Sequence, residues 1–259
     1  MIYFTPAYAL ATPDINRARV LYHALPGTIA ASSSAAGFAA ANAAYEGTFT
    51  AWRPTSAPAT WEVEYATAQT VDCVAIGAHE LSGATVTIDA WISAAWVEQI
   101  EFQPDDNSAI MACFQAVSTT KIRVTISAVK RVGVIFTGRA MVIPVRRYAP
   151  GADVDISRNT VFADSVSQTG QLFPVRVKRV SLEADYQWEH ITEDAYREIV
   201  EPFSKAVRGR LFFIAERPAG NPRAVGYGKV TEDIRYQRMG IGKRLVSTGF
   251  RFAGFADGN

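Results

Sequence analysis

The chain has 259 residues, of which 49% are hydrophobic and 20% charged, so it can bury a substantial core and should fold throughout. Its net charge is +1, and residues 1–150 hold 10 basic and 11 acidic side chains. Neither half therefore offers the basic surface of a protein that binds nucleic acid or an anionic membrane. The length fits two domains, which we place at residues 27–147 and 148–259 after a lead-in of residues 1–26.

The first residues lack the basic region and apolar core of a secretory signal, and no window approaches 18 uninterrupted apolar residues. We therefore expect synthesis in a cytoplasm and no membrane insertion. The lead-in is interrupted by Pro6, Pro13 and Pro26, and its segment 16–22 fits either a strand or a helical turn.

From Gly27 onward, short apolar runs alternate with small and turn residues, which is typical of an all-β domain. Trp61, Val63 and Tyr65 alternate with glutamates, which predicts a strand with one buried face. The apolar run 71–76 has no alternation and predicts a central strand covered on both faces. The predicted strands are Thr60–Tyr65, Val71–Ala78, Ala84–Ile92, Ala109–Phe114, Lys121–Ala128 and Gly138–Pro144.

The second region opens with a polar segment, residues 155–170, followed by a predicted strand at 173–183. Thr192 precedes two acidic residues, which indicates the N-cap of a helix over 195–207, and Pro202 predicts a kink or a break within it. Further strands are expected at 210–216, 224–231 and within 240–252. This region is therefore predicted to be α+β, with strands dominating.

A small-residue run at 30–34 is followed by Asn42, Gly47, Thr50 and Trp52, with Trp61 on the next strand. This order resembles the discoidin family of galactose-binding-like β-sandwiches, over less than half of the chain. The resemblance implies an antiparallel sandwich with both tryptophans in its core. It also implies a protein that binds or assembles rather than one that catalyses.

Some members of that family hold a structural calcium ion in the turn before the tryptophan. Here the acid of the turn is Glu46, a longer side chain than usual, and an inserted residue precedes it. Because a calcium site needs several convergent oxygens, we expect no metal here.

Trp91, Trp96 and His79 are the candidate ligand-binding residues, because an aromatic face can pack on a sugar ring. The competing interpretation is that the tryptophans pack across a hairpin and that His79 is a solvated loop residue. We favour this second interpretation, since aromatic side chains usually serve the core.

Chemistry has little support in the sequence. The three histidines lie far apart, no Gly-x-Ser-x-Gly occurs, and the two Gly-Lys pairs at 228–229 and 242–243 lack the rest of a phosphate-binding loop. Glu62 and Glu64 share one strand face, which does not make the facing carboxylates of a glycosidase. We therefore expect no enzyme and no cofactor.

Cys73 and Cys113 fall in apolar runs, so buried thiols are expected, but their redox state is open.

The order of elements in the second region, with a strand, Trp188, a helix, a strand and a terminal run of strands, resembles tail-tube and distal-tail proteins of long-tailed bacteriophages. The resemblance implies a non-enzymatic structural protein of the tail tip or baseplate, which is assembled in the host cytoplasm and becomes part of the virion. Its partners would be copies of itself in a ring and other tail proteins.

Phe250, Phe252 and Phe255 are the candidate interface residues, because large exposed apolar patches usually mark contacts with a neighbour. The competing interpretation is that they form the last core strand. The alternative function is that of a carbohydrate-binding, lectin-like module or surface-binding protein, with a host-surface glycan as its partner.

Overall fold

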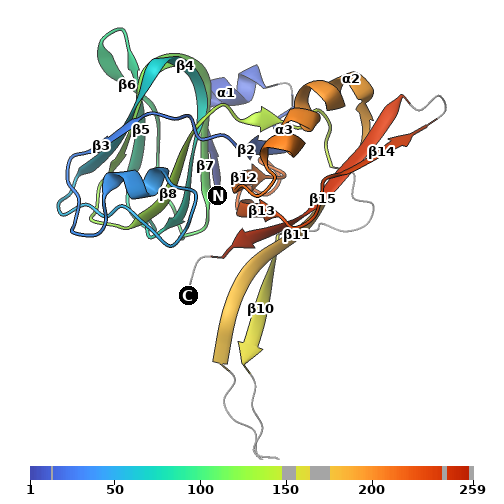
Figure 1. Cartoon of the computed structure of the whole chain (residues 1–259). Coiled ribbons are helices and arrows are strands. Elements are labelled where there is room, and N and C mark those ends of the chain that lie inside the picture. Colours follow the sequence, from blue (N-terminus) through green and yellow to red (C-terminus); the bar gives the residue numbers. More distant parts are fainter. Residues whose placement is uncertain (13, 148–155, 164–175, 241–243, 257–259) are drawn as a thin grey trace, which may run out of the picture.

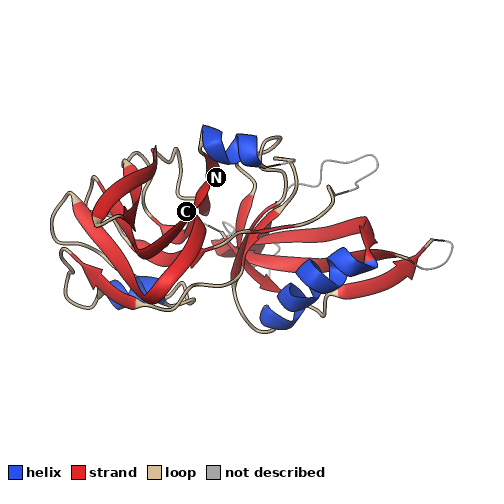
Figure 2. Ribbon diagram, turned by 90° about the horizontal axis from the view of Figure 1, so that it is seen from above, coloured by secondary structure: helices blue, strands red, loops and turns tan. Residues whose placement is uncertain are grey.

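The computed structural model describes residues 1–256 with the exception of 13, 148–155, 164–175 and 241–243. Within these residues the protein is mainly β, with one sheet of seven strands and one of eight (Figure 1). The predicted class, an antiparallel sandwich followed by a β-rich α+β region, is confirmed. Seen from above, the sandwich and the second sheet lie side by side, and the helical segment of residues 193–206 lies against the second sheet (Figure 1 and Figure 2).

The first sheet folds over on itself because its two longest strands, β4 (Ala59–His79) and β7 (Ile110–Ile126), bend together. Their register shifts twice, between Glu64 and Gln69 and between Val71 and Cys73. One half of the pair carries β3 and β5, and the other carries β8 and β1, so one sheet supplies both layers of the sandwich. Its other strands are β1 (Ile2–Phe4), β3 (Thr28–Ala31), β5 (Val86–Ile92), β6 (Ala95–Phe102) and β8 (Val132–Gly138).

The core of the sandwich contains both predicted tryptophans, with Trp52 0% and Trp61 1% exposed. The indole Nε1 of Trp52 donates to Ser33 O at 2.9 Å, and that of Trp61 donates to Ala40 O at 3.0 Å. Ala40 begins a short 3₁₀ helix, η1 (Ala40–Ala44). Both indoles therefore fill the core and also pin the small-residue segment 33–44 to it.

The second sheet has β15 near its centre. Its strands are β2 (Arg19–Leu21), β9 (Met141–Val142), β10 (Ser157–Ala163), β11 (Arg176–Thr192), β12 (Phe212–Ala215), β13 (Val225–Val230), β14 (Arg235–Met239) and β15 (Leu245–Phe255). β2 and β9 come from the N-terminal side of residue 148, and β2 settles the open segment 16–22 as a strand. The domain boundaries at 26/27 and 147/148 remain predictions.

The predicted helix is present, and its first turn is built as expected: Thr192 Oγ1 accepts a hydrogen bond from Ala195 N at 3.3 Å. It runs as α2 (Glu193–Ala195), a π-helical turn (Tyr196–Val200) and α3 (Glu201–Ala206). The wider turn lies directly before Pro202, which has no N–H to offer the helix ladder. A separate short helix, α1 (Pro6–Ala11), follows β1.

The sandwich has one core, and the second sheet has another beneath α3. A further cluster of buried apolar residues lies between the two sheets. On β12, Phe212 and Ile214 pack toward α3, while Phe213 and Ala215 pack toward the sandwich. On β4, Val74 and Ile76 face the sandwich core, and Cys73 and Ala75 face the second sheet. Coverage on both faces explains why the apolar run 71–76 of β4 does not alternate.

Candidate functional site

The turn at residues 45–50, where the family resemblance raises a calcium site, connects the two sheets instead. The carboxylate of Glu46 accepts a hydrogen bond from Leu211 N at 3.3 Å and lies 3.0 Å from an Arg210 guanidinium nitrogen. The hydroxyl of Tyr227 donates to Glu46 O at 2.6 Å. The acid of the turn is thus engaged with the second sheet. Within the described residues, no group of three or more His, Cys, Asp or Glu side chains is arranged to hold a metal ion.

Trp91 and Trp96 face each other across the β5–β6 hairpin, with ring centroids 5.1 Å apart in an edge-to-face arrangement. The guanidinium of Arg123 lies 4.4 Å from the Trp96 ring and 3.0 Å from Asp89 Oδ2. Both tryptophans are half-buried. The two tryptophans therefore pack on each other across the hairpin, and the Arg123 guanidinium covers one face of the Trp96 ring.

His79 does not lie in a solvated loop or on a binding surface: it ends β4 and is 4% exposed. Its Nδ1 accepts a hydrogen bond from Leu81 N at 3.1 Å, so Nε2 carries the proton and donates to Ser108 O at 2.8 Å. Both ring nitrogens are used inside the chain, and burial lowers the pKa of His79 to about 4. The prediction that His79 contacts a ligand is wrong, because this side chain ties two turns of the sandwich together.

Phe250 and Phe252 are each 1% exposed and pack in the core beneath α3, against Phe212 among others. The prediction that they form a subunit interface is wrong, since β15 is a central strand whose inner face the helix covers. Phe255 is 38% exposed at the end of the same strand. Its role in a contact stays a prediction.

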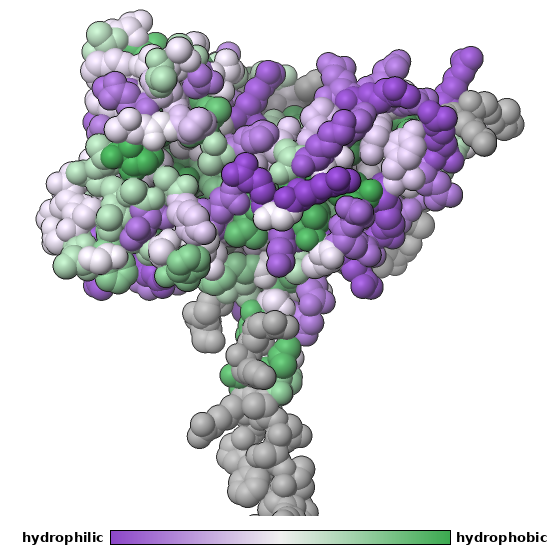
Figure 3. All heavy atoms as spheres, in the orientation of Figure 1, coloured by the Kyte–Doolittle hydropathy of each residue, from purple (hydrophilic) through white to green (hydrophobic). Residues whose placement is uncertain are grey.

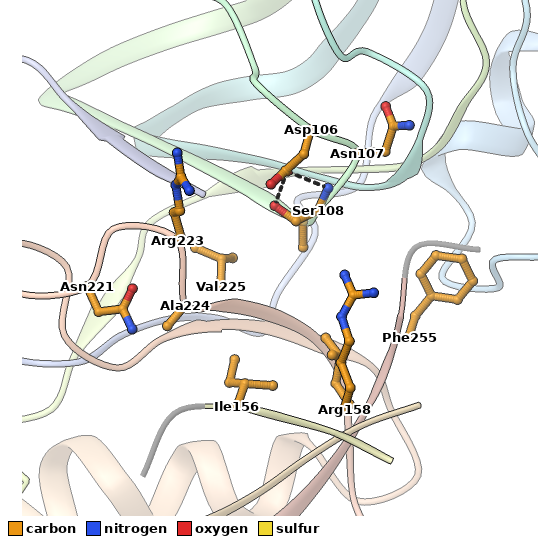
Figure 4. A pocket seen from close by; sticks show the side chains of 12 residues that line it. Asp106, Asn107, Ser108, Ile156, Arg158, Asn221, Arg223, Ala224, Val225 and Phe255 are labelled. Carbon is orange, nitrogen blue, oxygen red and sulfur yellow. Dashed lines mark hydrogen bonds between the residues drawn. The ribbon is translucent and has the colours of Figure 1, made fainter. Parts of the chain in front are cut away.

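The exposed end of β15 borders a hollow where the two sheets meet, with a volume of about 370 Å³ (Figure 4). Its walls come from the β6–β7 turn, the β12–β13 loop, the start of β10, and β11 and β15. The lining residues are Asp106, Asn107, Ser108, Ala109, Ile156, Arg158, Leu182, Asn221, Arg223, Ala224, Val225 and Phe255. Half of the lining residues are charged or polar and half are apolar, so the hollow offers both kinds of contact to a ligand.

The carboxylate of the hollow is held in place by its own turn. Asp106 Oδ1 accepts hydrogen bonds from Ser108 N at 2.9 Å and from Ser108 Oγ at 2.5 Å. Burial opposes ionisation, but these bonds hold the pKa of Asp106 below its usual value. Arg223 is largely exposed and lies 3.5 Å from Asp105 Oδ2. The hollow therefore presents a fixed anion beside guanidinium groups.

A long hairpin of β10 and β11 projects away from both parts of the protein (Figure 1). Phe162 on β10 and Val177 on β11 are direct cross-strand partners, and they are 58% and 55% exposed. Figure 3 shows apolar side chains where the hairpin leaves the body. Within the described part of the chain, β10 pairs on one side only, with β11, so its other edge is unpaired.

The pKa values of two buried titratable groups of the sandwich, Asp72 and His79, are shifted in opposite directions. Burial raises the pKa of Asp72 to about 6, although Asp72 Oδ1 accepts a 2.7 Å hydrogen bond from Ala140 N. Asp72 borders a second hollow of about 560 Å³ beside Tyr8 and Arg139. Burial lowers the pKa of His79, because it disfavours the charged form of the ring.

These shifts predict opposite pH dependences of stability between about pH 4 and 6. For Asp72, the folded state holds its proton more tightly than the unfolded chain, so its contribution to stability falls as pH rises. For His79, the unfolded chain takes the proton first, so its contribution rises with pH. Each accounts for about 2–3 kcal/mol over this range, and in the natural protein they largely cancel.

Asp72→Asn is therefore expected to show stability that increases from pH 4 to 6, and His79→Gln stability that decreases. Urea denaturation at several pH values measures both slopes, and the natural chain is the reference. Parallel slopes in all three proteins would contradict the two assignments.

No protein-family model matches the chain, and no curated protein matches it. Among solved structures, it is similar to chitosan-binding module 1 of a chitosanase/glucanase from Paenibacillus sp. IK-5, with 23% identity and a TM-score of 0.40 over 45% of this chain and 97% of the module. It is also similar to the family 32 carbohydrate-binding module of C. perfringens NanJ in complex with galactose, with 16% identity and a TM-score of 0.41 over 46% and 98%. A pectin-binding carbohydrate-binding module is similar too, with 16% identity and a TM-score of 0.40 over 45% of this chain and 93% of the module.

All three similarities concern less than half of this chain, and the ligands named are properties of those modules. We therefore take the function of this protein from its own surface. None of the helices in the described part of the chain has the length and apolar character needed to cross a membrane.

The sequence interpretation missed both surfaces that stand out in the structure. Asp106, Arg158 and Arg223 come from polar segments with no local pattern that points to a site. The exposed Phe162 lies within the segment 155–170, which was interpreted as polar. Only the short apolar run at residues 161–163 could have indicated a strand there.

Proposed function

We propose that the protein is a non-enzymatic structural subunit of a bacteriophage tail tip or baseplate, which assembles with copies of itself into a ring and with other tail proteins in the virion. The observation that carries the proposal is the projecting hairpin with its exposed pair, Phe162 and Val177. Large apolar side chains on an unpaired sheet edge are a liability for an isolated chain and a contact surface for an assembled one.

The direction of the hairpin supports a partner from outside the chain. The described part of the hairpin extends the second sheet away from the rest of the protein (Figure 1). Phe162 and Val177 within it stay 58% and 55% exposed. A neighbouring subunit can add a strand to β10 and bury both side chains at once. In a closed ring the same contact repeats around the axis, so one substitution acts at every interface.

Phe162→Asp is expected to abolish assembly, because it places a charge in the buried contact. Sedimentation of the purified protein measures the size of the assembly. Since Phe162 is exposed within one chain, the stability of the single subunit should change by less than about 0.5 kcal/mol.

The matched control is Val129→Asp, an exposed apolar residue of the β7–β8 turn that is 40% accessible; this variant should assemble like the natural protein. A natural protein that stays monomeric at high concentration would contradict the ring proposal, and so would a Phe162→Asp protein that assembles normally.

A second candidate function, binding of a host-surface glycan, is favoured by one specific observation. The hollow of Figure 4 combines an exposed aromatic ring, Phe255, with carboxylate, amide and guanidinium groups. Sugars offer an apolar ring face and many hydroxyl groups, and both kinds of partner are present there. The two functions are compatible, since the hollow and the tip of the described hairpin are separate surfaces.

A further inference from the structure

We infer that the hollow between the two sheets binds a saccharide that carries a carboxylate group, such as a uronic acid. The inference rests on the glycan-binding function proposed above and names its ligand class and its site. It does not depend on ring assembly.

The positions of the charged groups come first. Arg158 rises from β10 and Arg223 from the β12–β13 loop, and both side chains extend toward the turn that carries Asp106 (Figure 4). A guanidinium group matches a carboxylate with two parallel hydrogen bonds. Each guanidinium has five N–H donors, so Arg223 can bind a ligand carboxylate in addition to its contact with Asp105, and Arg158 in addition to its contacts within the chain. Two such groups at one hollow therefore favour a ligand with a carboxylate.

The second requirement comes from Asp106. Its ionised carboxylate only accepts hydrogen bonds, and Ser108 supplies two of them. The remaining acceptor positions fit hydroxyl donors of a ligand. Inorganic phosphate offers at most two hydroxyl donors and no ring, and its charge faces that of Asp106, which costs affinity. The hollow thus selects a molecule that has hydroxyl groups as well as a carboxylate.

The third requirement is an apolar ring face. In the view of Figure 4, Phe255 stands at the side of the hollow opposite Arg223, and Ile156 forms part of the floor. Phe255 is the last large side chain of β15 and is partly exposed, whereas Phe250 and Phe252 of the same strand are buried. A sugar ring can cover the phenyl ring while its substituents reach the polar walls.

Isothermal titration of the full chain with a trisaccharide of galacturonic acid tests the inference. Saturable binding is expected, and Arg223→Gln and Phe255→Ala should each weaken it by at least about tenfold, since each removes a main contact. Both side chains are at least partly exposed, so the variants should fold, which circular dichroism checks. Arg208→Gln is the matched control, because this exposed arginine lies beside Asp233 and outside the hollow.

Two further probes separate the sources of any binding. Equal binding of the matching neutral galactose trisaccharide would overturn the acidic ligand class but leave glycan binding standing. Equal binding of inorganic phosphate, or binding of the acidic trisaccharide that Arg223→Gln and Phe255→Ala leave unchanged, would overturn the site. Failure of all three probes to bind would overturn the inference without bearing on ring assembly, which the Phe162→Asp variant tests separately.

Discussion

Trp61→Ala is expected to lower the free energy of unfolding by about 3–5 kcal/mol, as measured by urea denaturation followed by circular dichroism. Trp61 is one of the largest fully buried side chains of the protein and lies in the middle of the sandwich core. Its removal leaves a cavity and also breaks the hydrogen bond from Nε1 to Ala40 O. Both losses act on the strand β4, which pairs with three other strands.

Two variants make this result specific. Trp61→Phe keeps an aromatic ring in the core and should lose clearly less stability than Trp61→Ala. Phe49→Ala removes an aromatic ring that is 77% exposed and should change stability by less than about 0.5 kcal/mol. A loss below about 1 kcal/mol for Trp61→Ala would contradict a core position for this residue.

Arg147→Met is expected to cost about 3–5 kcal/mol, because it keeps the charge of Glu216 buried and removes the ion pair that Arg147 makes with it. Arg147 Nη1 lies 2.6 Å from Glu216 Oε1, and the two side chains are 7% and 6% exposed. Arg147 also donates to Asp185 O at 2.7 Å and lies over the ring of Tyr186. The pair therefore fastens the chain that leaves the sandwich to the second sheet.

The double variant Arg147→Met/Glu216→Leu should recover most of that loss, since it removes both charges and keeps apolar volume. Arg235→Met is the surface control: Arg235 lies at the same 2.6 Å from Asp185, but both side chains are about half exposed, so its loss should stay below about 1 kcal/mol. A double variant as unstable as Arg147→Met alone would show that the cost comes from lost packing rather than from a stranded charge.

Local patterns were enough to predict much of the fold. The alternation at Trp61, Val63 and Tyr65 corresponds to a strand with one buried face, because successive side chains of a strand point to opposite sides. The cap at Thr192 corresponds to the start of α2 for an equally local reason, a hydrogen bond three residues along the chain. The predicted strands 60–65 and 71–78 proved to be two halves of β4, and 109–114 and 121–128 two halves of β7.

Some strands were missed. β6 mixes apolar residues with Glu98 and Glu101 and lies at the edge of its sheet, where few of its side chains are buried. β8 was not predicted at all, although it is buried throughout. Its residues form a non-alternating apolar run like the one at 71–76, and the same rule would have predicted a strand covered on both faces.

By itself, the sequence determined the β-rich class, the strand of Trp61 and the helix of the second region, since each depends on neighbours within a few residues. The core position of Trp52 was implied by the family resemblance. Only the tertiary structure decided which side chains are available for function. Phe250 and Phe252 lie on the face of β15 that packs beneath α3, whereas Phe255, an odd number of residues further along, lies on the opposite and more exposed face. The hollow brings Asp106 together with Arg223, more than 100 residues apart along the chain, and a contact of that range leaves no periodic trace in the sequence.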